Sequence, residues 1–361
     1  MGLEKTMATV EEIPSIRAFC IDFNWDKVGP ADPGLFGQAD PVAHVEWYRA
    51  LGANVIQTFC VSYNGYAWYK ASTVAPVLPA MTHDFLPEIT ELAHRAGMLS
   101  LGYFNLSSNP VWKAQHPEAA YARRPPEGST STKVGHNVAH SLVYTDAYLD
   151  YFGRLIEDAL RQTDIDGFMV DWLKPPERFG QPWLPCERQL YRDLMHRPLP
   201  AQVKMDSSEI LEYERCCLER AWARIRQAVA AVRPAIVWTN HPFRCANDPL
   251  WDGHRVLREA DWILNESPDA ELLGWLHRQA GPRTRLIQNL CGWKDHDASL
   301  WKKIDFPTVG LYGFAQADPH TTLPSMDYTP ACAANERNIS IIRQAYHFLQ
   351  PKTGGDISPW K

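Results

Sequence analysis

An apolar run ends on a carboxylate and an indole in the stretch Ile165-Asp166-Gly167-Phe168-Met169-Val170-Asp171-Trp172. Its four residues 167–170 have the continuous apolar character of a strand that is buried on both faces. Asp171 would then stand at the end of this strand, with Trp172 beside it. A cap on the following helix is the alternative role for Asp171. The prolines at 175–176 come too soon for a helix to begin directly, which favours a functional role for this carboxylate.

Short β-rich runs recur along the chain on either side of this stretch. The eight runs lie near residues 16–23, 54–61, 99–104, 165–171, 236–240, 262–266, 286–290 and 308–314. Stretches with helical spacing of apolar residues lie between them and after the last, among them residues 40–52, 84–97, 148–160, 211–232 and 331–349. This alternation indicates a parallel sheet with crossover helices. Eight such units predict an α/β fold, the closed (β/α)8 or TIM barrel.

The competing fold is an open, doubly wound sheet. That fold would place a Gly-rich phosphate loop after the first strand, where this chain reads Asp22-Phe23-Asn24-Trp25. No linker or low-complexity segment divides the chain, so we expect residues 1–361 to form a single domain. Two long insertions, near residues 105–144 and 173–208, follow strands and are expected to wall the pocket.

Composition limits the classes of partner. The formal net charge is −6 and no basic run is present, which argues against nucleic-acid binding. The eight cysteines are scattered without CxxC spacing, and the first 14 residues contain no apolar core of a signal peptide. No apolar stretch reaches the length of a membrane span. We therefore expect a cytoplasmic protein in a reducing compartment, without a membrane partner, and a homo-oligomer is compatible with the sequence.

Carboxylates, amides and indoles gather at the predicted strand ends, which in a barrel of this kind surround the active site. Glu266, at the end of the sixth strand, would face Asp171 of the fourth across the barrel. The candidate substrate-binding residues are Asp22, Asn24, Tyr63, Asn64, Trp68, Asn105, Trp112, Trp172, Asn240, His241 and Trp293. The sequence lacks HxH, HExxH and GxSxG motifs, so we expect no metal and no other cofactor.

Two carboxylates on different strands, with aromatic side chains beside them to bind a sugar ring, are typical of the active site of a glycoside hydrolase. We assign Asp171 as nucleophile and Glu266 as general acid/base, acting on an oligosaccharide. An exposed loop position or a supporting hydrogen bond is the alternative for Glu266. Asp22 would bind sugar hydroxyls or orient Asp171. Retention requires carboxylates roughly 5 Å apart, whereas a separation of roughly 6.5–9.5 Å implies inversion.

Two other functions fit the same residues. One is a lyase or isomerase that acts on a sugar or uronate, with His241 as base and Tyr63 as acid. The other is a carbohydrate-binding barrel without catalysis. Ultraviolet absorbance of the product would identify a lyase, and binding without turnover would identify the silent barrel.

The first half of the chain, roughly residues 40 to 175, resembles the α-L-fucosidase-like glycoside hydrolases. The matching segments are His44-Val45-Glu46-Trp47-Tyr48, Leu51-Gly52-Ala53-Asn54, Asn64-Gly65-Tyr66-Ala67-Trp68-Tyr69 with Ser72, Asp84-Phe85-Leu86, Ala93-His94-Arg95-Ala96-Gly97-Met98, Gly102-Tyr103-Phe104 and Gly167-Phe168-Met169-Val170-Asp171. The resemblance implies a barrel in which Asp171 is the nucleophile of a retaining mechanism. It also implies two sugar-gripping histidines, but Ser62 and Tyr63 stand at those positions, which argues against fucose as the sugar.

Overall fold

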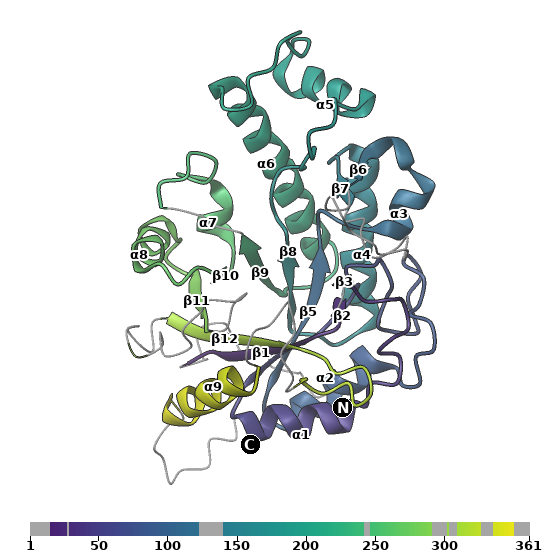
Figure 1. Ribbon diagram of the computed structural model, residues 1–361, viewed down its shortest axis with the longest axis vertical. Coiled ribbons are helices and arrows are strands. Elements are labelled where there is room, and N and C mark those ends of the chain that lie inside the picture. Colours follow the sequence, from purple (N-terminus) through teal and green to yellow (C-terminus); the bar gives the residue numbers. More distant parts are fainter. Residues whose placement is uncertain are drawn as a thin grey trace.

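The computed structural model describes residues 15–26, 29–122, 140–241, 246–290, 302, 309–325 and 335–349. Eight parallel strands close into a barrel in the order β1-β12-β11-β10-β9-β8-β5-β4 (Figure 1). Their bounds are Arg17–Asp22 (β1), Val55–Gln57 (β4), Leu99–Asn105 (β5), Gly167–Asp171 (β8), Ile236–His241 (β9), Trp262–Asn265 (β10), Arg285–Asn289 (β11) and Val309–Gln316 (β12). Each strand falls at one of the eight predicted runs, and the (β/α)8 barrel is confirmed.

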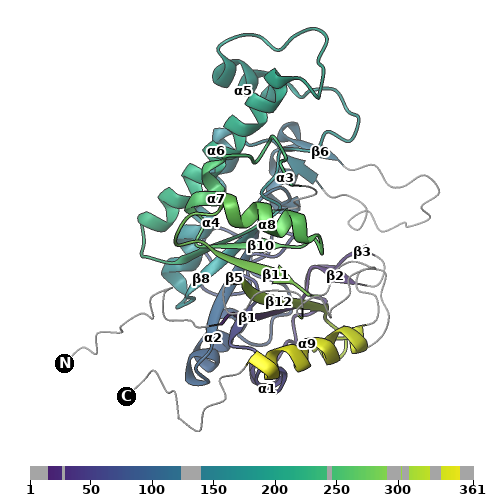
Figure 2. The same cartoon turned by 90° about the vertical axis from the view of Figure 1, so that its left-hand side faces the viewer.

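Helices lie on the outside of the barrel, as the turned view in Figure 2 also shows. They are α1 (Pro41–Leu51), α2 (Phe85–Arg95), α4 (Asp146–Gln162), α6 (Ser208–Ala230), α7 (Arg255–Glu259), α8 (Ala270–Gln279) and α9 (Asn335–Leu349). Helix α1 illustrates why they begin and end where they do. The Asp40 side chain accepts from two backbone N–H groups of its first turn, and Gly52 closes it at a φ of 89°.

Strand register brings the predicted site residues to one end of the barrel. Asp171 of β8 is paired with Asn105 of β5, and Asn265 of β10 with His241 of β9. Gly167 permits the close approach of β8 and β9, because a Cβ there would lie 2.2 Å from the Ile236 carbonyl oxygen. The carboxyl ends of β5, β8, β9 and β10 therefore converge on a small area.

Two insertions extend this end of the barrel. The first carries α3 (Pro110–Gln115), the 3-10 helix η2 (Pro117–Ala119) and the two-stranded sheet of β6 (Ala120–Ala122) and β7 (His140–Leu142). The second carries α5 (Pro185–Met195) and leads into α6. Figure 1 shows α5 and the start of α6 projecting above the barrel. A further short sheet pairs β2 (Trp25–Asp26) with β3 (Gly29–Pro30) after β1.

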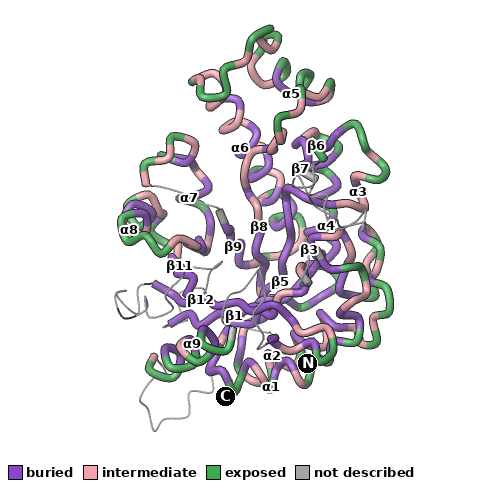
Figure 3. The backbone as a smooth tube through the Cα atoms, viewed as in Figure 1, coloured by how far each residue is buried: buried purple, intermediate pink, exposed green. Residues whose placement is uncertain are grey.

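The core explains much of the aromatic content. Figure 3 shows a buried barrel surrounded by helices whose outer sides are exposed. Six tryptophans are almost fully buried: Trp68, Trp222, Trp238, Trp251, Trp262 and Trp275. These indoles fill the barrel and its helix layer, so at least six of the fourteen tryptophans serve packing. Among the described residues, no helix is both long and apolar enough to span a membrane.

Candidate active site

A cavity of about 250 Å³ opens at the carboxyl ends of the barrel strands. Six of the predicted site residues line it: Asp22, Asn24, Asp171, Trp172, Asn240 and Glu266. Aromatic and apolar side chains complete the wall, among them Trp25, Phe59, Tyr103, Tyr312 and Phe314. Three carboxylates thus meet in a partly apolar cavity. In the described ranges, no group of three or more His, Cys, Asp or Glu side chains has an arrangement that could hold a metal ion.

Asp171 is held by three hydrogen bonds. The Tyr103 hydroxyl donates to Oδ2 at 2.6 Å, and the Asn240 amide donates to Oδ1 at 2.9 Å. The backbone N–H of Trp172 donates to Oδ1 at 2.8 Å, from a residue whose φ of 57° lies in the left-handed region. That conformation is uncommon for a bulky side chain and is typical of functional sites. The carboxylate is therefore fixed in position from three directions.

Asn240 joins the two predicted catalytic carboxylates. Its Nδ2 donates to Oδ1 of Asp171 and to Oε1 of Glu266, each at 2.9 Å. Both partners accept hydrogen bonds, so the amide nitrogen, and not the oxygen, must face them. The two carboxylate oxygens consequently lie no more than two such bond lengths apart. The limit applies to Oδ1 of Asp171 and Oε1 of Glu266, and it is compatible with the roughly 5–5.5 Å between the carboxyl groups of retaining enzymes.

Burial shifts the pKa of each carboxylate in the cavity. Loss of solvent raises the pKa of Asp171 to about 6, although its three hydrogen bonds and the charge of Lys174 act in the opposite direction. Burial and the negative charge of Asp171 raise the pKa of Glu266 to about 8, against the lowering effect of the Asn240 amide. Near neutral pH, Asp171 is therefore mostly ionised and Glu266 mostly protonated. Such a pair can supply a nucleophile and an acid at once.

Asp22 is the third carboxylate. Burial raises its pKa to about 7, and the negative charge of Asp171 adds to this rise, while the Asn24 N–H, which donates to Oδ1 at 2.8 Å, lowers it. The Asn24 side chain in turn accepts from the backbone N–H of Tyr63 at 2.8 Å. Asp22 is thus in a position suited to sugar hydroxyls, at the end of β1.

Trp172 and a cation form the outer wall. The Lys174 ammonium lies 4.4 Å from the centre of the Trp172 ring, and it forms an ion pair with Glu177 at 2.8 Å. The Tyr63 ring meets the edge of the Trp172 ring at a centroid distance of 6.0 Å. Tyr63 itself is buried behind this contact and is outside the residues that line the cavity.

Five predicted binding residues, Tyr63 and the four described next, are not among the residues that line the cavity. Trp68 is 2% exposed and stacks on Phe23, so it is a core residue and not a platform. Trp112 is 4% exposed and stacks on His116 within the first insertion. Asn64 is bonded to the Ser62 hydroxyl, and Asn105 donates to the Tyr103 hydroxyl at 3.2 Å. Asn105 therefore supports the site through Tyr103. The His241 side chain and Trp293 lie outside the described residues.

Among the lining residues that were not predicted, Tyr103 and Lys174 act on Asp171, one by a hydrogen bond and the other by its charge. Tyr103 precedes Asn105 by two positions on β5, so both side chains point to the same face of the strand, and this spacing was a usable signal. Lys174 follows the strand after Asp171, but nothing in the sequence shows that its ammonium folds back over Trp172.

Residues 41–172 match the family model described as hypothetical glycosyl hydrolase 6. This segment covers less than half of the chain and includes Asp171. The match supports a glycoside hydrolase with a carbohydrate substrate. Comparison with the curated proteins gives no match.

Solved structures similar to this chain share the barrel. One is the α-L-fucosidase isoenzyme 2 from Paenibacillus thiaminolyticus, with 14% identity and a TM-score of 0.63, covering 92% of this chain and 49% of that one. Another is the PgaB (BpsB) glycoside hydrolase domain from Bordetella bronchiseptica, with 12% identity and a TM-score of 0.55, covering 91% and 99%. The chain thus spans about half the length of the fucosidase, and at these identities the likeness concerns the fold.

Proposed function

We propose that this protein is a retaining glycoside hydrolase in which Asp171 is the nucleophile and Glu266 the general acid/base. The observation that carries the proposal is the single Asn240 nitrogen that bonds both carboxylates at 2.9 Å. This proximity favours direct attack of Asp171 on the sugar, as in retention, over attack by an interposed water molecule, as in inversion.

The chemistry follows from the two protonation states. Glu266 gives its proton to the glycosidic oxygen while Asp171 attacks the anomeric carbon, so that the leaving alcohol departs and a glycosyl–aspartate ester forms. The Glu266 carboxylate then accepts a proton from water, whose oxygen displaces Asp171 from the sugar. Glu266 is protonated again and Asp171 is free. The two steps together restore the protonation states from which the cycle began.

The wall of the cavity suits a sugar ring. Trp25, Trp172 and Phe59 offer flat apolar surfaces, and Asp22 and Asn24 offer hydrogen-bond partners for hydroxyl groups. The identity of the sugar is a separate question, since Ser62 and Tyr63 replace the histidines that the fucosidase resemblance implies. Fucose is therefore tested as one sugar among several.

The test is a screen against nitrophenyl glycosides of common sugars in both anomeric forms. The wild-type protein should release nitrophenol from at least one, and Asp171→Asn should lower kcat by at least about 10³-fold. Proton NMR of the first-formed product should show the anomer of the substrate. An Asp171→Asn variant with undiminished turnover would overturn the proposal, and an inverted product would overturn the retaining mechanism. Binding without turnover in the wild type would favour a silent carbohydrate-binding barrel, and an ultraviolet-absorbing product a lyase.

A further inference from the structure

A second and larger hollow lies beside the catalytic cavity. It has a volume of about 880 Å³, and we call it the outer groove. The residues used below, all of which line it, are Lys174, Phe179, Trp183, Glu214 and Asp248. Lys174 also lines the catalytic cavity, so the two hollows meet at this side chain. The outer groove belongs to the second insertion, between β8 and α6, which projects beyond the barrel (Figure 2).

We propose that the outer groove binds the leaving-group part of a neutral oligosaccharide, while the catalytic cavity holds one terminal sugar. This rests on the proposed function. Ligand pockets for drug-sized molecules measure roughly 300–1,000 Å³, so the catalytic cavity, at about 250 Å³, is small for more than one ring. The outer groove falls near the upper end of that range. A longer substrate that places its terminal sugar between the carboxylates can continue past Lys174, which lines both hollows, into this groove.

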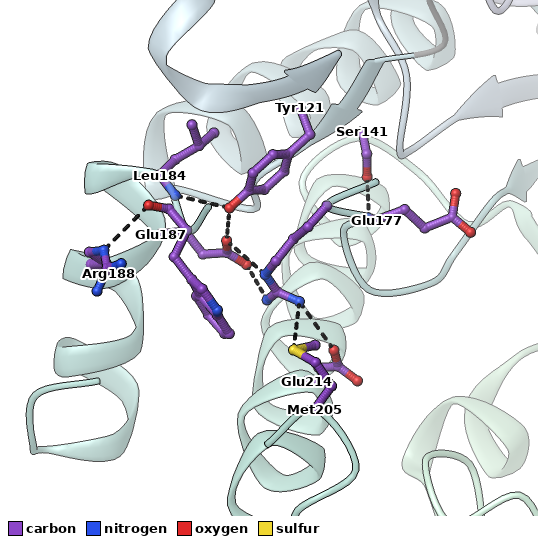
Figure 4. Close-up of polar contacts among 10 residues, drawn as sticks. Tyr121, Ser141, Glu177, Leu184, Glu187, Arg188, Met205 and Glu214 are labelled. Carbon is purple, nitrogen blue, oxygen red and sulfur yellow. Dashed lines mark hydrogen bonds and ion pairs between the residues drawn. The ribbon is translucent and has the colours of Figure 1, made fainter. Parts of the chain in front are cut away.

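The wall of the outer groove is fixed before any ligand arrives. Arg178 donates to both oxygens of the buried Glu187, at 3.2 and 2.6 Å, and the Tyr121 hydroxyl donates to the same carboxylate. The Arg178 guanidinium lies 3.6 Å from the centre of the Trp183 ring. Figure 4 shows the Tyr121 hydroxyl pointing at the Glu187 carboxylate, with Glu214 farther away beside Met205. A bidentate, stacked arginine holds the Trp183 wall in one arrangement, which lowers the entropic cost of binding.

Phe179 offers the groove an aromatic face. It is partly exposed, and its φ of 49° is left-handed, as is the φ of 74° at the neighbouring Gly180. A bulky residue seldom adopts this conformation, and such positions are concentrated at binding sites. An apolar ring of this kind suits the C–H face of a sugar.

The charges of the groove favour a neutral ligand. Lys174 is paired with Glu177 at 2.8 Å, and the charge of Arg178 is neutralised by Glu187. Glu214 lies farther from Arg178, at 3.8 Å, and burial raises its pKa to about 7. Among the hydrogen bonds of the described residues, the Asp248 carboxylate accepts one, from the backbone N–H of Leu250 at 2.9 Å. These two acids can accept hydrogen bonds from sugar hydroxyls and would repel a uronate or a sulfated sugar bound next to them. Arg188, the remaining cation of the lining, donates to the Trp183 carbonyl.

The test compares Phe179→Ala with Phe348→Ala, which removes a 65% exposed phenylalanine on α9. The substrates are the active nitrophenyl monosaccharide and oligosaccharides of two to six units with the same terminal sugar. In Phe179→Ala, kcat/KM for the tetrasaccharide should fall about tenfold, and for the nitrophenyl glycoside less than about twofold. Phe348→Ala should change neither. Equal losses on both substrates, or none, would overturn the proposal, as would products from internal cleavage.

A second variant covers the case in which Phe179→Ala does not fold. Glu214→Gln keeps the shape of the side chain and should lower kcat/KM for the tetrasaccharide about threefold, with little change for the nitrophenyl glycoside. It should also weaken the discrimination against a uronate at the second sugar. Unchanged discrimination together with unchanged tetrasaccharide kinetics would overturn the assignment of the groove.

Failure of the proposed function would be recognised separately. If the wild-type protein hydrolyses no glycoside in the panel, the groove is tested by binding alone. Calorimetric titration with malto-, cello-, manno- and chitohexaose then measures whether the outer groove binds an oligosaccharide. Binding that is lost in Phe179→Ala and kept in Phe348→Ala supports the outer groove without catalysis. Absence of binding, or equal binding by the two variants, overturns it.

Discussion

The Tyr103 hydroxyl lies 2.6 Å from Oδ2 of Asp171, as a hydrogen-bond donor from the neighbouring strand. The bond stabilises the ionised carboxylate, and it lowers the pKa of Asp171 against the rise that burial causes. Because burial and the negative charge of Asp171 raise the pKa of Tyr103 well above its usual value, the phenol remains protonated and continues to donate. Tyr103 therefore supports the ionised form of Asp171, the proposed nucleophile.

Removal of this donor should impair the nucleophile. In Tyr103→Phe, we expect the pKa of Asp171 to rise, so the acidic limb of the kcat/KM profile should move to higher pH. A hydrogen bond to a charged group is worth about 1.5–3 kcal/mol, which corresponds to a loss of roughly 10–100-fold in rate. A pH series of initial rates on the best nitrophenyl glycoside measures both effects. If the limb stays in place, Tyr103 does not act on the ionisation of Asp171.

The pH profile of the wild-type enzyme should be bell-shaped. Activity needs Asp171 ionised and Glu266 protonated, so it should rise through about pH 6 and fall through about pH 8. Glu266→Gln should remove the alkaline limb and slow the turnover of substrates with poor leaving groups far more than that of activated nitrophenyl glycosides. The pH profile of this variant tests the assignment. If the fall in activity at alkaline pH persists in Glu266→Gln, another residue is the acid.

The same pKa shift should make Glu266 costly for stability. Its pKa is raised in the folded protein, so between about pH 4.5 and about pH 8 the native state retains a proton that the unfolded chain has lost. The free energy of unfolding contributed by this group therefore falls as pH rises through that window. Glu266→Gln should raise the Tm at pH 8 by a few degrees and change it little at pH 4.5. Calorimetric scans at the two pH values test this, and an equal gain at both would contradict it.

Close packing at Gly167 predicts a loss of stability that is independent of the active-site chemistry. A Cβ at this position would meet the Ile236 carbonyl oxygen at 2.2 Å, and backbone atoms of β9 cannot move aside cheaply. Gly167→Ala should cost about 1–3 kcal/mol. The control is Gly274→Ala in α8, where the nearest atom is an arginine side-chain nitrogen at 3.7 Å and alanine should gain about 0.5–1 kcal/mol. Urea unfolding of both variants gives the comparison.

The sequence predicted the barrel and the position of Asp171 because both depend on local pattern. An apolar run that stops at a carboxylate identifies a strand end without knowledge of the rest of the chain. The six cavity residues that were predicted all lie at or just after such strand ends. Tyr103 was missed because an aromatic residue within a strand usually belongs to the core, and only the register of β5 against β8 brings it to Asp171.

Aromatic platforms were less predictable. Trp68 and Trp172 have the same side chain, yet one stacks on Phe23 in the core and the other lines the cavity. The difference arises from the direction of each side chain, which for Trp172 depends on a left-handed backbone that no composition rule indicates. The bond from Asn240 to two carboxylates was likewise beyond the sequence, because it requires the positions of three separate strand ends.

The place of the second insertion in the chain has an evolutionary consequence. Residues 174–207 leave the barrel directly after the nucleophile strand and return at the start of α6, and they supply most of the outer groove. The bonds that align Asp171 come from β5, β9 and the first residue after β8, all outside this insertion. Natural variation in these 34 positions could therefore retune which glycans are accepted while the hydrolytic machinery stays intact, and an exchange of this segment between homologues would be a direct route to new specificities.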